Sequence, residues 1–582
     1  MSIVQSLFAA SYLASSFYSA PQMNLIQPTG DRIDQEIVLR IEVLSPNEII
    51  ELDAQAFDQK GEAWVSHAAF QADAKGTVDL STDAPLPNSS YDTIDSMGLF
   101  WSMHPLAGDP SSSFKCKDDQ FTVAFTLLRN GHPQESKTLT RFLKKPEVER
   151  KEIRENGIAG VLFAPPSKTP LPVIITLSGS NGGFSENRAK LLASHGFAVL
   201  ALGYFGAEGL PPKLQDIPLE YFEQAFSWLK TQPQIDSSRI GLYGISRGGE
   251  LALLLGSTFP NSIQAITAVV PSSVVYGGLS ETPVNAWTYR GKPVLPSAPV
   301  PQIDLGDGKG KTAENPANTR QNFIEGMKQS EAFAAAAIPV EKIHCPVLIV
   351  SGGDDQMWPS DLFCERILDR LKNTSTPCTH LHYPNAGHGI NIPNLPTPGP
   401  TYYHPVSKIW LSTGGSQAAD AAASQDAWNQ LVGFFEKSLQ KREPMNEQKF
   451  SLLKSLHLPI GEYAITGSGP LGIRNLREIK DLDLIVTPML WNELAEKYGI
   501  TDTGQVKKIV FPGGMIEAFW EESFYSAPND PSAPLLADRI SHAEIIDGLP
   551  FDSLENTLFF KRKQGREKDL KDIRLIEETL KQ

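Results

Sequence analysis

The first quarter of the chain alternates between apolar and polar positions over short stretches. The runs EIVLRIEVL (36–44), AWVSHAAFQA (63–72) and FTVAFTLL (121–128) show this alternation, and turns rich in Pro, Gly and polar residues separate them. Because successive side chains of a strand point to opposite faces, such runs are typical of strands with one buried face. Short strands at this spacing predict a β-sandwich of immunoglobulin type over residues 21–150.

After this region, apolar runs alternate with helical stretches. The apolar runs are VIITLSG (173–179), AVLALGYF (198–205), RIGLYG (239–244) and PVLIVSGG (346–353). Apolar strands that are separated by helices predict a parallel sheet covered on both faces. We assign residues 151–443 to this α/β domain.

The two ends of the chain differ from these domains. Residues 1–20 are expected to form an N-terminal tail, since the segment has no Lys or Arg and no convincing cleavage site. KREPMNEQK (441–449) is typical of a linker, and residues 446–582 contain strand-like runs and a charged terminal helix. This predicts a third, α+β domain over 446–582, in agreement with the three or four domains that a chain of 582 residues suggests.

Composition narrows the class of protein. The net charge of −15 argues against a general binder of nucleic acid or of anionic membranes. The chain has no apolar run long enough for a membrane helix. The four cysteines show no metal or redox spacing, and the chain ends in ETLKQ rather than in a peroxisomal S-K-L signal. We therefore expect a cytoplasmic protein, whose oligomeric state the sequence leaves open.

One motif in the α/β domain carries nucleophilic chemistry. Gly244-Ile245-Ser246-Arg247-Gly248 lies between a strand-like run and an apolar helix-like run. In a nucleophile elbow of this form, small residues allow a sharp turn that exposes the serine oxygen above the sheet. A plain strand-to-helix turn is the alternative interpretation, and the strand–turn–helix context favours the catalytic one. Ser246 is the candidate nucleophile.

A serine nucleophile needs a base and an orienting carboxylate. In α/β-hydrolases these follow the serine in the order acid, then histidine. GGDDQMWPS places Asp355 after an apolar strand, with Asp354 as the reserve, and NAGHGINIP places His388 on a glycine-flanked loop. The competing histidines lack such a loop; they are His380, His382 and His404.

The oxyanion formed in such a reaction is expected to be held by backbone amides. The amide of Arg247 is one candidate, and LSGSNGGF (177–184) supplies Gly179 and Ser180 from the loop after an earlier strand. A glycine-rich turn without this role fits the same residues.

Residues 22–440 resemble the acyl-CoA thioesterases that are related to bile acid-CoA:amino acid N-acyltransferase. The resemblance rests on DSMGLFWSMHP, ENRAKLLASHGFAVLALGYFGAEGLP, GLYGISRGGELAL, GGDDQMWPS, NAGHGINIPNLP and DAWNQLVGFFEK. It implies an N-terminal sandwich on an α/β-hydrolase domain that cleaves acyl-CoA through an acyl-enzyme, with Ser246, Asp355 and His388 as the triad. The acyltransferase branch typically has cysteine at the elbow, so Ser246 favours water as the acceptor.

The third domain carries a different signal. Gly467-Ser468 precedes Asp481 and Asp483, which are expected to lie on one side of a strand, and Glu517 lies on a later strand. Two carboxylates can hold Mg²⁺ together with phosphate oxygens. The pattern resembles the nucleotidyltransferase core, which implies Mg²⁺ and a nucleotide as ligands; solvated carboxylates without a ligand are the alternative.

The sequence thus supports a ranked set of functions. Hydrolysis of acyl-CoA by a serine thioesterase that uses no cofactor comes first. Hydrolysis of carboxylic esters, or acyl transfer from CoA to an amine, keeps the same triad with another substrate or acceptor. A nucleotide-binding or nucleotidyltransferase protein, acting through the third domain, is the alternative from a different class.

Overall fold

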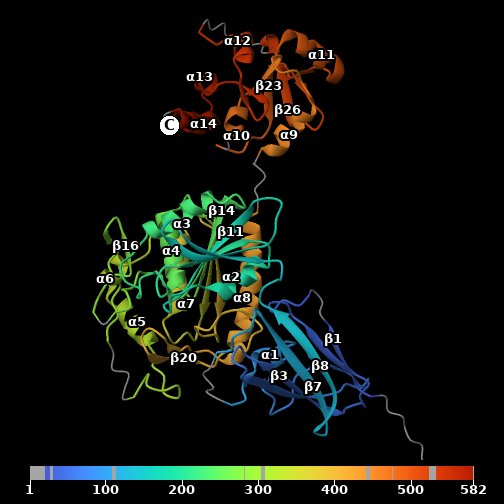
Figure 1. The fold of residues 1–582 in the computed structure, drawn as a ribbon. Coiled ribbons are helices and arrows are strands. Elements are labelled where there is room, and N and C mark those ends of the chain that lie inside the picture. Colours follow the sequence, from blue (N-terminus) through green and yellow to red (C-terminus); the bar gives the residue numbers. More distant parts are fainter. Residues whose placement is uncertain are drawn as a thin grey trace, which may run out of the picture. The chain divides into compact units, whose positions relative to one another are not determined.

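The computed structural model describes residues 20–26, 30–107, 113–280, 282–302, 308–440, 446–474, 476–523 and 532–580. The predicted tail at 1–20 therefore lies, except for Ala20, outside the described residues. The chain divides into two compact units, Met1–Gln440 and Lys441–Gln582 (Figure 1). Within the described ranges, none of the helices has the length and apolar character that a membrane span requires.

The N-terminal part of the first unit consists of two antiparallel sheets. The larger has the strand order β6 (His104–Pro105), β4 (Ala63–Gln71), β3 (Ile49–Phe57), β7 (Gln120–Arg129) and β8 (His132–Phe142); the smaller has the order β1 (Gln22–Ile26), β2 (Val38–Glu42) and β5 (Val78–Asp79). Inward residues such as Leu52, Val123 and Ile41 are buried in one shared core. The predicted alternation is seen in β3 and β4, where every second residue is buried.

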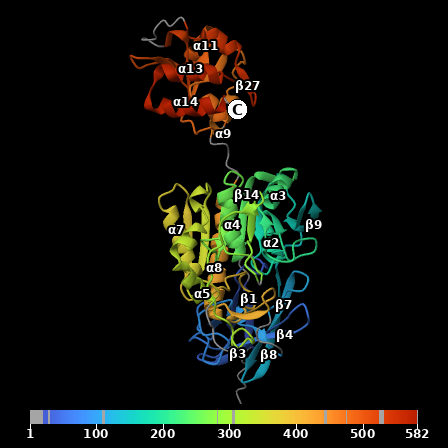
Figure 2. The ribbon, with the colours of Figure 1, turned by 90° about the vertical axis from the view of Figure 1, so that its left-hand side faces the viewer.

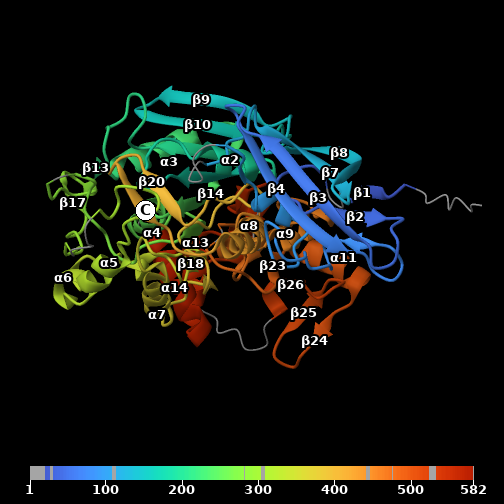
Figure 3. The same ribbon diagram turned by 90° about the horizontal axis from the view of Figure 1, so that it is seen from below.

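A larger sheet forms the centre of the first unit. Its strands follow the order β19 (Cys378–Tyr383), β18 (Val347–Gly352), β15 (Ala265–Val269), β14 (Ile235–Ile245), β11 (Leu171–Leu177), β12 (Ala198–Gly203), β10 (Ile158–Ala164) and β9 (Glu149–Glu155). The strands from β19 to β12 are parallel to one another, and β10 and β9 are antiparallel to their neighbours. Figure 3 shows β9 and β10 side by side at this edge. The predicted parallel sheet is thus present.

Helices cover both faces of this sheet. They are α2 (Glu186–Ala193) and α8 (Gln417–Ser438) on one face, and α3 (Glu220–Lys230), α4 (Arg247–Thr258) and α7 (Ser360–Leu371) on the other (Figure 2). Successive side chains of the middle strand β11 show why both faces are covered. Ile174 is buried in the core that includes α2 and α8, whereas its neighbours Val173 and Ile175 are buried in the core that includes α3, α4 and α7. A strand that is buried on both faces reads as a continuous apolar run.

Shorter elements connect the strands and helices of the first unit. They are β13 (Ile217–Pro218), β16 (Trp287–Tyr289), β17 (Lys292–Pro293), α5 (Arg320–Met327), α6 (Ser330–Ala335), a 3-10 turn (Val340–Lys342), β20 (Thr401–His404) and β21 (Ile409–Ser412). β20 and β21 form an antiparallel hairpin. In the sandwich, α1 (Gly98–Trp101) contacts β4.

The second unit is built on a mixed sheet with the order β24 (Thr501–Asp502), β25 (Lys507–Val510), β26 (Ile516–Phe519), β23 (Leu482–Val486), β22 (Tyr463–Thr466), β28 (Leu549–Phe551) and β27 (Glu544–Ile546). Its helices are α9 (Glu447–Ser455), α10 (Gly469–Ile473), α11 (Pro488–Tyr498), α12 (Leu536–Ser541), α13 (Leu554–Gln564) and α14 (Glu567–Thr579), with a 3-10 turn at Glu521–Ser523. It has a separate hydrophobic core.

A buried carboxylate joins the sandwich to the central sheet. Asp34 Oδ2 accepts hydrogen bonds from Trp428 Nε1 on α8, at 3.0 Å, and from His195 Nε2 just after α2, at 2.5 Å. Arg32 Nε lies 2.9 Å from the other carboxylate oxygen. Burial by itself would raise the pKa of Asp34, but His195 and Arg32 lower it from 3.8 to about 2.

Replacing this carboxylate is expected to weaken the first unit. Asp34→Ala leaves Trp428 and His195 without their buried acceptor, so the free energy of unfolding in urea should fall by about 3–5 kcal/mol. The wild-type protein should also lose stability as the pH falls from about 4 towards 2, because a lowered native pKa stabilises only the ionised form. The exposed Asp31→Ala is the control; equal stability of the two variants would contradict the role of Asp34.

Candidate functional site

Ser246 occupies a strained turn between strand β14 and helix α4. Its backbone has φ 54° and ψ −121°, a conformation that residues with a side chain rarely adopt. Its amide donates to Val269 O at 2.8 Å, and its carbonyl accepts from Glu250 N at 3.0 Å. These bonds fix the turn to β15 on one side and to the first turn of α4 on the other.

The two glycines of the motif are required by close backbone contacts. A Cβ at Gly244 would lie 2.0 Å from Gly248 O, and a Cβ at Gly248 would lie 2.5 Å from the carbonyl oxygens of Leu177 and Ser178. Real Cβ atoms do not approach backbone so closely, so both positions admit only glycine. The motif therefore forms a nucleophile elbow in which β11 and α4 touch.

The predicted base and acid are bonded to each other. His388 Nδ1 lies 2.8 Å from Asp355 Oδ2, and the carboxylate is fully buried. Asp355 Oδ1 accepts from the amides of Met357 at 3.0 Å and Trp358 at 3.2 Å. Since a carboxylate accepts from Nδ1–H, Nε2 is left to take a proton.

The alternatives for the acid and the base have other partners. Asp354 is exposed and accepts from Gln356 Nε2 at 2.5 Å and from Gly415 N at 2.9 Å. His380 and His382 both bond to Ser351 Oγ, at 2.8 and 3.1 Å. His404 bonds to Ser180 Oγ at 2.8 Å. The geometry therefore favours Asp355 over its reserve.

The three predicted triad residues lie at one edge of the sheet. Ser246 follows β14, Asp355 follows β18 and His388 follows β19. With β15 between β14 and β18, these strands are parallel and end at the same edge. The ring of Trp358 packs edge-on against the His388 ring, with centroids 5.9 Å apart, and its Nε1 donates to Val270 O next to β15. Among the described residues, Ser246 Oγ makes no hydrogen bond, and the contact from His388 Nε2 to this oxygen stays a prediction. Such catalytic bonds often tighten only when substrate is bound.

The candidate oxyanion donors come from the elbow itself and from a loop beside it. A Cβ added to Gly179 would lie 3.5 Å from the Ser246 Cβ, so this loop runs directly beside the nucleophile. Within the described part of the chain, the amides of Gly179, Ser180 and Arg247 have no hydrogen-bond acceptor. Arg247 is also the first residue of α4. The amides of the first helical turn have no acceptor within the helix, and this end of the helix favours negative charge. The three predicted donors are thus unsatisfied near Ser246.

The side chain of Arg247 is buried behind the elbow. Its guanidinium lies 3.2 Å from a carboxylate oxygen of Glu250 and donates to Tyr276 O at 2.9 Å and Gly277 O at 3.1 Å. Trp287 Nε1 donates to the other oxygen of Glu250 at 2.8 Å. Burial raises the pKa of Glu250 to about 7, although the charge of Arg247 opposes this. The pair anchors α4 to the segment that follows β15.

Sequence reasoning missed a buried carboxyl beneath the His388 loop. Asp420, on the first turns of α8, is 3% exposed and accepts from Gly387 N at 2.7 Å. A Cβ at Gly389 would lie 2.5 Å from Asp420 Oδ2, so glycines on both sides of His388 are packed against this side chain. Burial raises the pKa of Asp420 to about 7, and the nearby carboxylate of Asp355 adds to the rise.

In the second unit, the predicted acidic residues converge from neighbouring strands. Asp483 pairs in register with Glu517 on β26, and a Cβ at Gly467 would lie 2.4 Å from Asp483 Oδ2. Burial raises the pKa of Asp483 to about 6, and Asp481 and Glu517 add to this. However, Glu517 is paired with Lys508 Nζ at 2.6 Å. Ser468 directly precedes α10 and is mostly buried.

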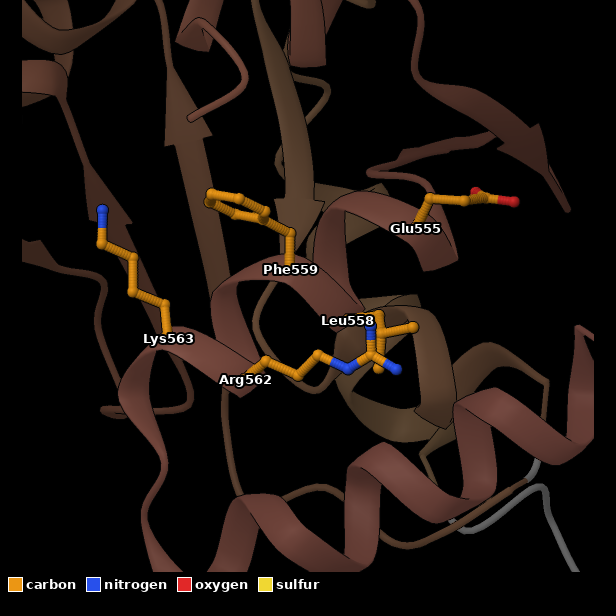
Figure 4. Close-up of a pocket in the computed structure, with 5 residues that line it drawn as sticks. All are labelled: Glu555, Leu558, Phe559, Arg562 and Lys563. Atoms are coloured by element: carbon orange, nitrogen blue, oxygen red, sulfur yellow. The ribbon is translucent and has the colours of Figure 1, made fainter. Parts of the chain in front are cut away.

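A separate pocket in the second unit lies on α13 (Figure 4). It is lined by Glu555, Leu558, Phe559, Arg562 and Lys563. In this view the guanidinium of Arg562 lies beside Leu558, whereas the ammonium of Lys563 lies on the side of the Phe559 ring, 5.9 Å from its centroid. None of the predicted metal or nucleotide residues lines it. In the part of the chain that the structure describes, no group of three or more His, Cys, Asp or Glu residues is placed to hold a metal ion.

The pH dependence of stability should report the Asp420 carboxyl. A raised native pKa means that the stabilising contribution is present below about pH 4 and is lost as the pH rises towards 7. Asp420→Asn keeps an acceptor for Gly387 N and cannot ionise, so its thermal midpoint should gain on the wild type between pH 5 and pH 8. The control is Asp426→Asn on the exposed side of α8; a gain that does not change with pH would refute the assignment.

Two family models match the chain. The one described as "Acyl-CoA thioester hydrolase/BAAT N-terminal region" matches residues 34–155, and the one described as "BAAT / Acyl-CoA thioester hydrolase C terminal" matches residues 217–441. The matched regions cover the sandwich apart from β1, the elbow, and the loops of Asp355 and His388, and they end where the second unit begins.

Three curated relatives illustrate the similarity. Mouse acyl-coenzyme A thioesterase 6 is 32% identical over 73% of this chain and 98% of its own length; human acyl-coenzyme A thioesterase 1 is 32% identical over 72% and 97%. The mouse peroxisomal succinyl-coenzyme A thioesterase is 31% identical over 71% and 96%. Because relatives are named for different compartments, the cytoplasmic location stays a prediction. The identity and the coverage show that the chain belongs to the acyl-CoA thioester hydrolase/BAAT family.

Proposed function

We propose that the first unit hydrolyses acyl-CoA thioesters to free acid and CoA, with Ser246 as nucleophile, His388 as general base and Asp355 as the orienting carboxylate. The bond of 2.8 Å between His388 Nδ1 and Asp355 Oδ2, at the same sheet edge as the strained Ser246, carries this proposal. The names of the relatives supply the substrate class.

The proposed reaction has two stages. His388 Nε2 takes the Ser246 proton while Oγ attacks the thioester carbonyl, and the amides of Gly179, Ser180 and Arg247 hold the oxyanion. The C–S bond then breaks, and CoA leaves as a thiol with the proton from His388. Water, deprotonated by the same imidazole, attacks the acyl-serine and releases the acid. The buried Asp355 stabilises the imidazolium that forms in both stages.

Two alternatives share this triad. A carboxylic ester hydrolase would cleave an oxygen ester, and an N-acyltransferase would pass the acyl group to an amine instead of water. Serine at the elbow favours water. Comparing a panel of acyl-CoAs with p-nitrophenyl esters, each with and without glycine or taurine, separates the three activities.

Removing the nucleophile is expected to abolish turnover. Ser246→Ala should lower kcat for CoA release by about 10⁴-fold or more, because no acyl-enzyme can form. CoA release is measured with a thiol reagent across acyl-chain lengths. Turnover close to that of the wild type would refute the proposal.

The two adjacent aspartates should behave differently. Asp355→Asn is expected to lower kcat by about 10⁴-fold, since an amide favours the wrong imidazole tautomer. Asp354→Asn should keep most of the activity, because its carboxylate is exposed and bonds to Gln356 and Gly415 rather than to His388. Equal losses in the two variants would mean that the wrong carboxylate has been assigned.

We propose finer assignments for the other two regions. An immunoglobulin-type topology for the N-terminal sheets is supported by two antiparallel sheets around one core.

A nucleotidyltransferase-like second unit is supported by the convergence of Gly467, Asp483 and Glu517. There Asp481 and Asp483 would hold Mg²⁺, which in proteins needs only one or two carboxylates beside phosphate oxygens. Bound Mg²⁺ would neutralise phosphate charge at this site.

The nucleotide proposal is tested by titrating the full chain with ATP and Mg²⁺ in a calorimeter. Heat of binding that Asp483→Asn removes, and that Glu555→Gln on α13 leaves intact, would support it. No heat above background would refute it, and it would leave the thioesterase proposal unaffected.

A further inference from the structure

The Ser180 side chain is held by a histidine that takes no part in the proposed triad. Ser180 Oγ lies 2.8 Å from His404 Nε2, at the end of β20 and far from Ser180 in the sequence. His404 is 4% exposed, and burial lowers its pKa, so the imidazole is neutral near pH 7. A neutral imidazole has one proton, and the direction of this bond depends on which nitrogen carries it.

The surroundings of His404 decide the tautomer. Its Nδ1 faces two backbone donors, Ser407 N at 3.0 Å and Val406 N at 3.3 Å. A nitrogen that accepts from amides cannot carry a proton itself, so the proton is on Nε2. His404 therefore donates to Ser180, and Ser180 Oγ accepts.

Within the described part of the chain, this leaves the Ser180 hydroxyl proton without an acceptor. Among the described residues, Ser180 Oγ takes part in the His404 bond alone. The side chain is partly exposed, and its neighbour Gly179 packs against Ser246. A hydroxyl that accepts from an imidazole is polarised and becomes a better donor.

We propose that the Ser180 hydroxyl donates a hydrogen bond to the carbonyl oxygen of the substrate as it becomes an oxyanion, and that His404 is the positioning residue that aims it. Ser180 is then a catalytic residue through its side chain as well as through its amide. The inference rests on the proposed function and deepens it, because it adds a side-chain hydroxyl to the backbone amides that would hold the oxyanion.

An isosteric pair of variants provides the main test. Ser180→Thr keeps a hydroxyl, and Ser180→Val has the shape of Thr without the hydroxyl. We therefore expect kcat for CoA release to be about 100-fold lower in the Val variant than in the Thr variant, with KM little changed. Ser167→Ala, an exposed serine before the opposite end of β11, is the control. Equal kcat values for Thr and Val would overturn the proposal.

The role of His404 is tested by a double-mutant cycle. His404→Leu should lower kcat in the wild type, but it should change kcat less than about 2-fold in the Ser180→Val background, since the hydroxyl through which it acts is gone. His404→Gln, which offers an amide N–H near the place of Nε2, should restore part of the loss. A full effect of His404→Leu in the Val background would show a structural role and refute the positioning role.

Labelling by a fluorophosphonate separates this inference from the substrate assignment. The reagent forms a bond between Ser246 Oγ and phosphorus, releases fluoride, and places its P=O oxygen among the same donors. Ser180→Val should slow the second-order labelling rate relative to Ser180→Thr even if no acyl-CoA is hydrolysed. Labelling of the wild type without any CoA release would overturn the substrate assignment alone, whereas equal labelling rates for the two variants would overturn the role of Ser180.

Discussion

The geometry of the site depends on one backbone turn. At Ser246 the chain passes from β14 into α4 with a positive φ, and the turn is held by Val269 O and Glu250 N. The contacts of Gly244 and Gly248 leave no room for any Cβ, so the strain is maintained by packing between β11, β14 and α4. Strain of this kind persists only where the surrounding structure over-determines it. The central sheet and its helices supply that constraint.

Buried polar groups then fix the loops around the turn. Asp355 and Asp420 hold the His388 loop from two sides, and the pair of Arg247 and Glu250 anchors the start of α4. Each of these groups makes at least one hydrogen bond inside the protein, which offsets part of the cost of burying a polar group. The same logic holds at Asp34, where the sandwich meets α2 and α8. Buried hydrogen bonds and ion pairs thus orient the loops that carry Ser246 and His388.

Much of this architecture follows from local sequence patterns. Continuous apolar runs predict the parallel strands, and GISRG between such a run and a helix predicts the elbow. A position just after an apolar strand points to Asp355, and a glycine-flanked loop points to His388. The two side chains can meet because parallel strands end at a common edge.

Local pattern fails where a role depends on a distant partner. Asp354 and Asp355 look alike in sequence, and only the burial of one distinguishes them. Asp420 belongs to none of the motifs quoted from the sequence, and His404 is one histidine among several. Their roles arise when α8 and β20 are brought against loops that precede them by tens to hundreds of residues.

The hairpin of β20 and β21 has a consequence for how the acyl group is accommodated. Its first strand ends at His404, which bonds to Ser180 on the predicted oxyanion loop, and just after its second strand Thr413 O accepts from His388 N at 2.8 Å. A shift of this hairpin would therefore displace the loop of Ser180 and the loop of His388 together. We therefore expect differences in acyl-chain length to be accommodated by segments that contact neither of these two loops.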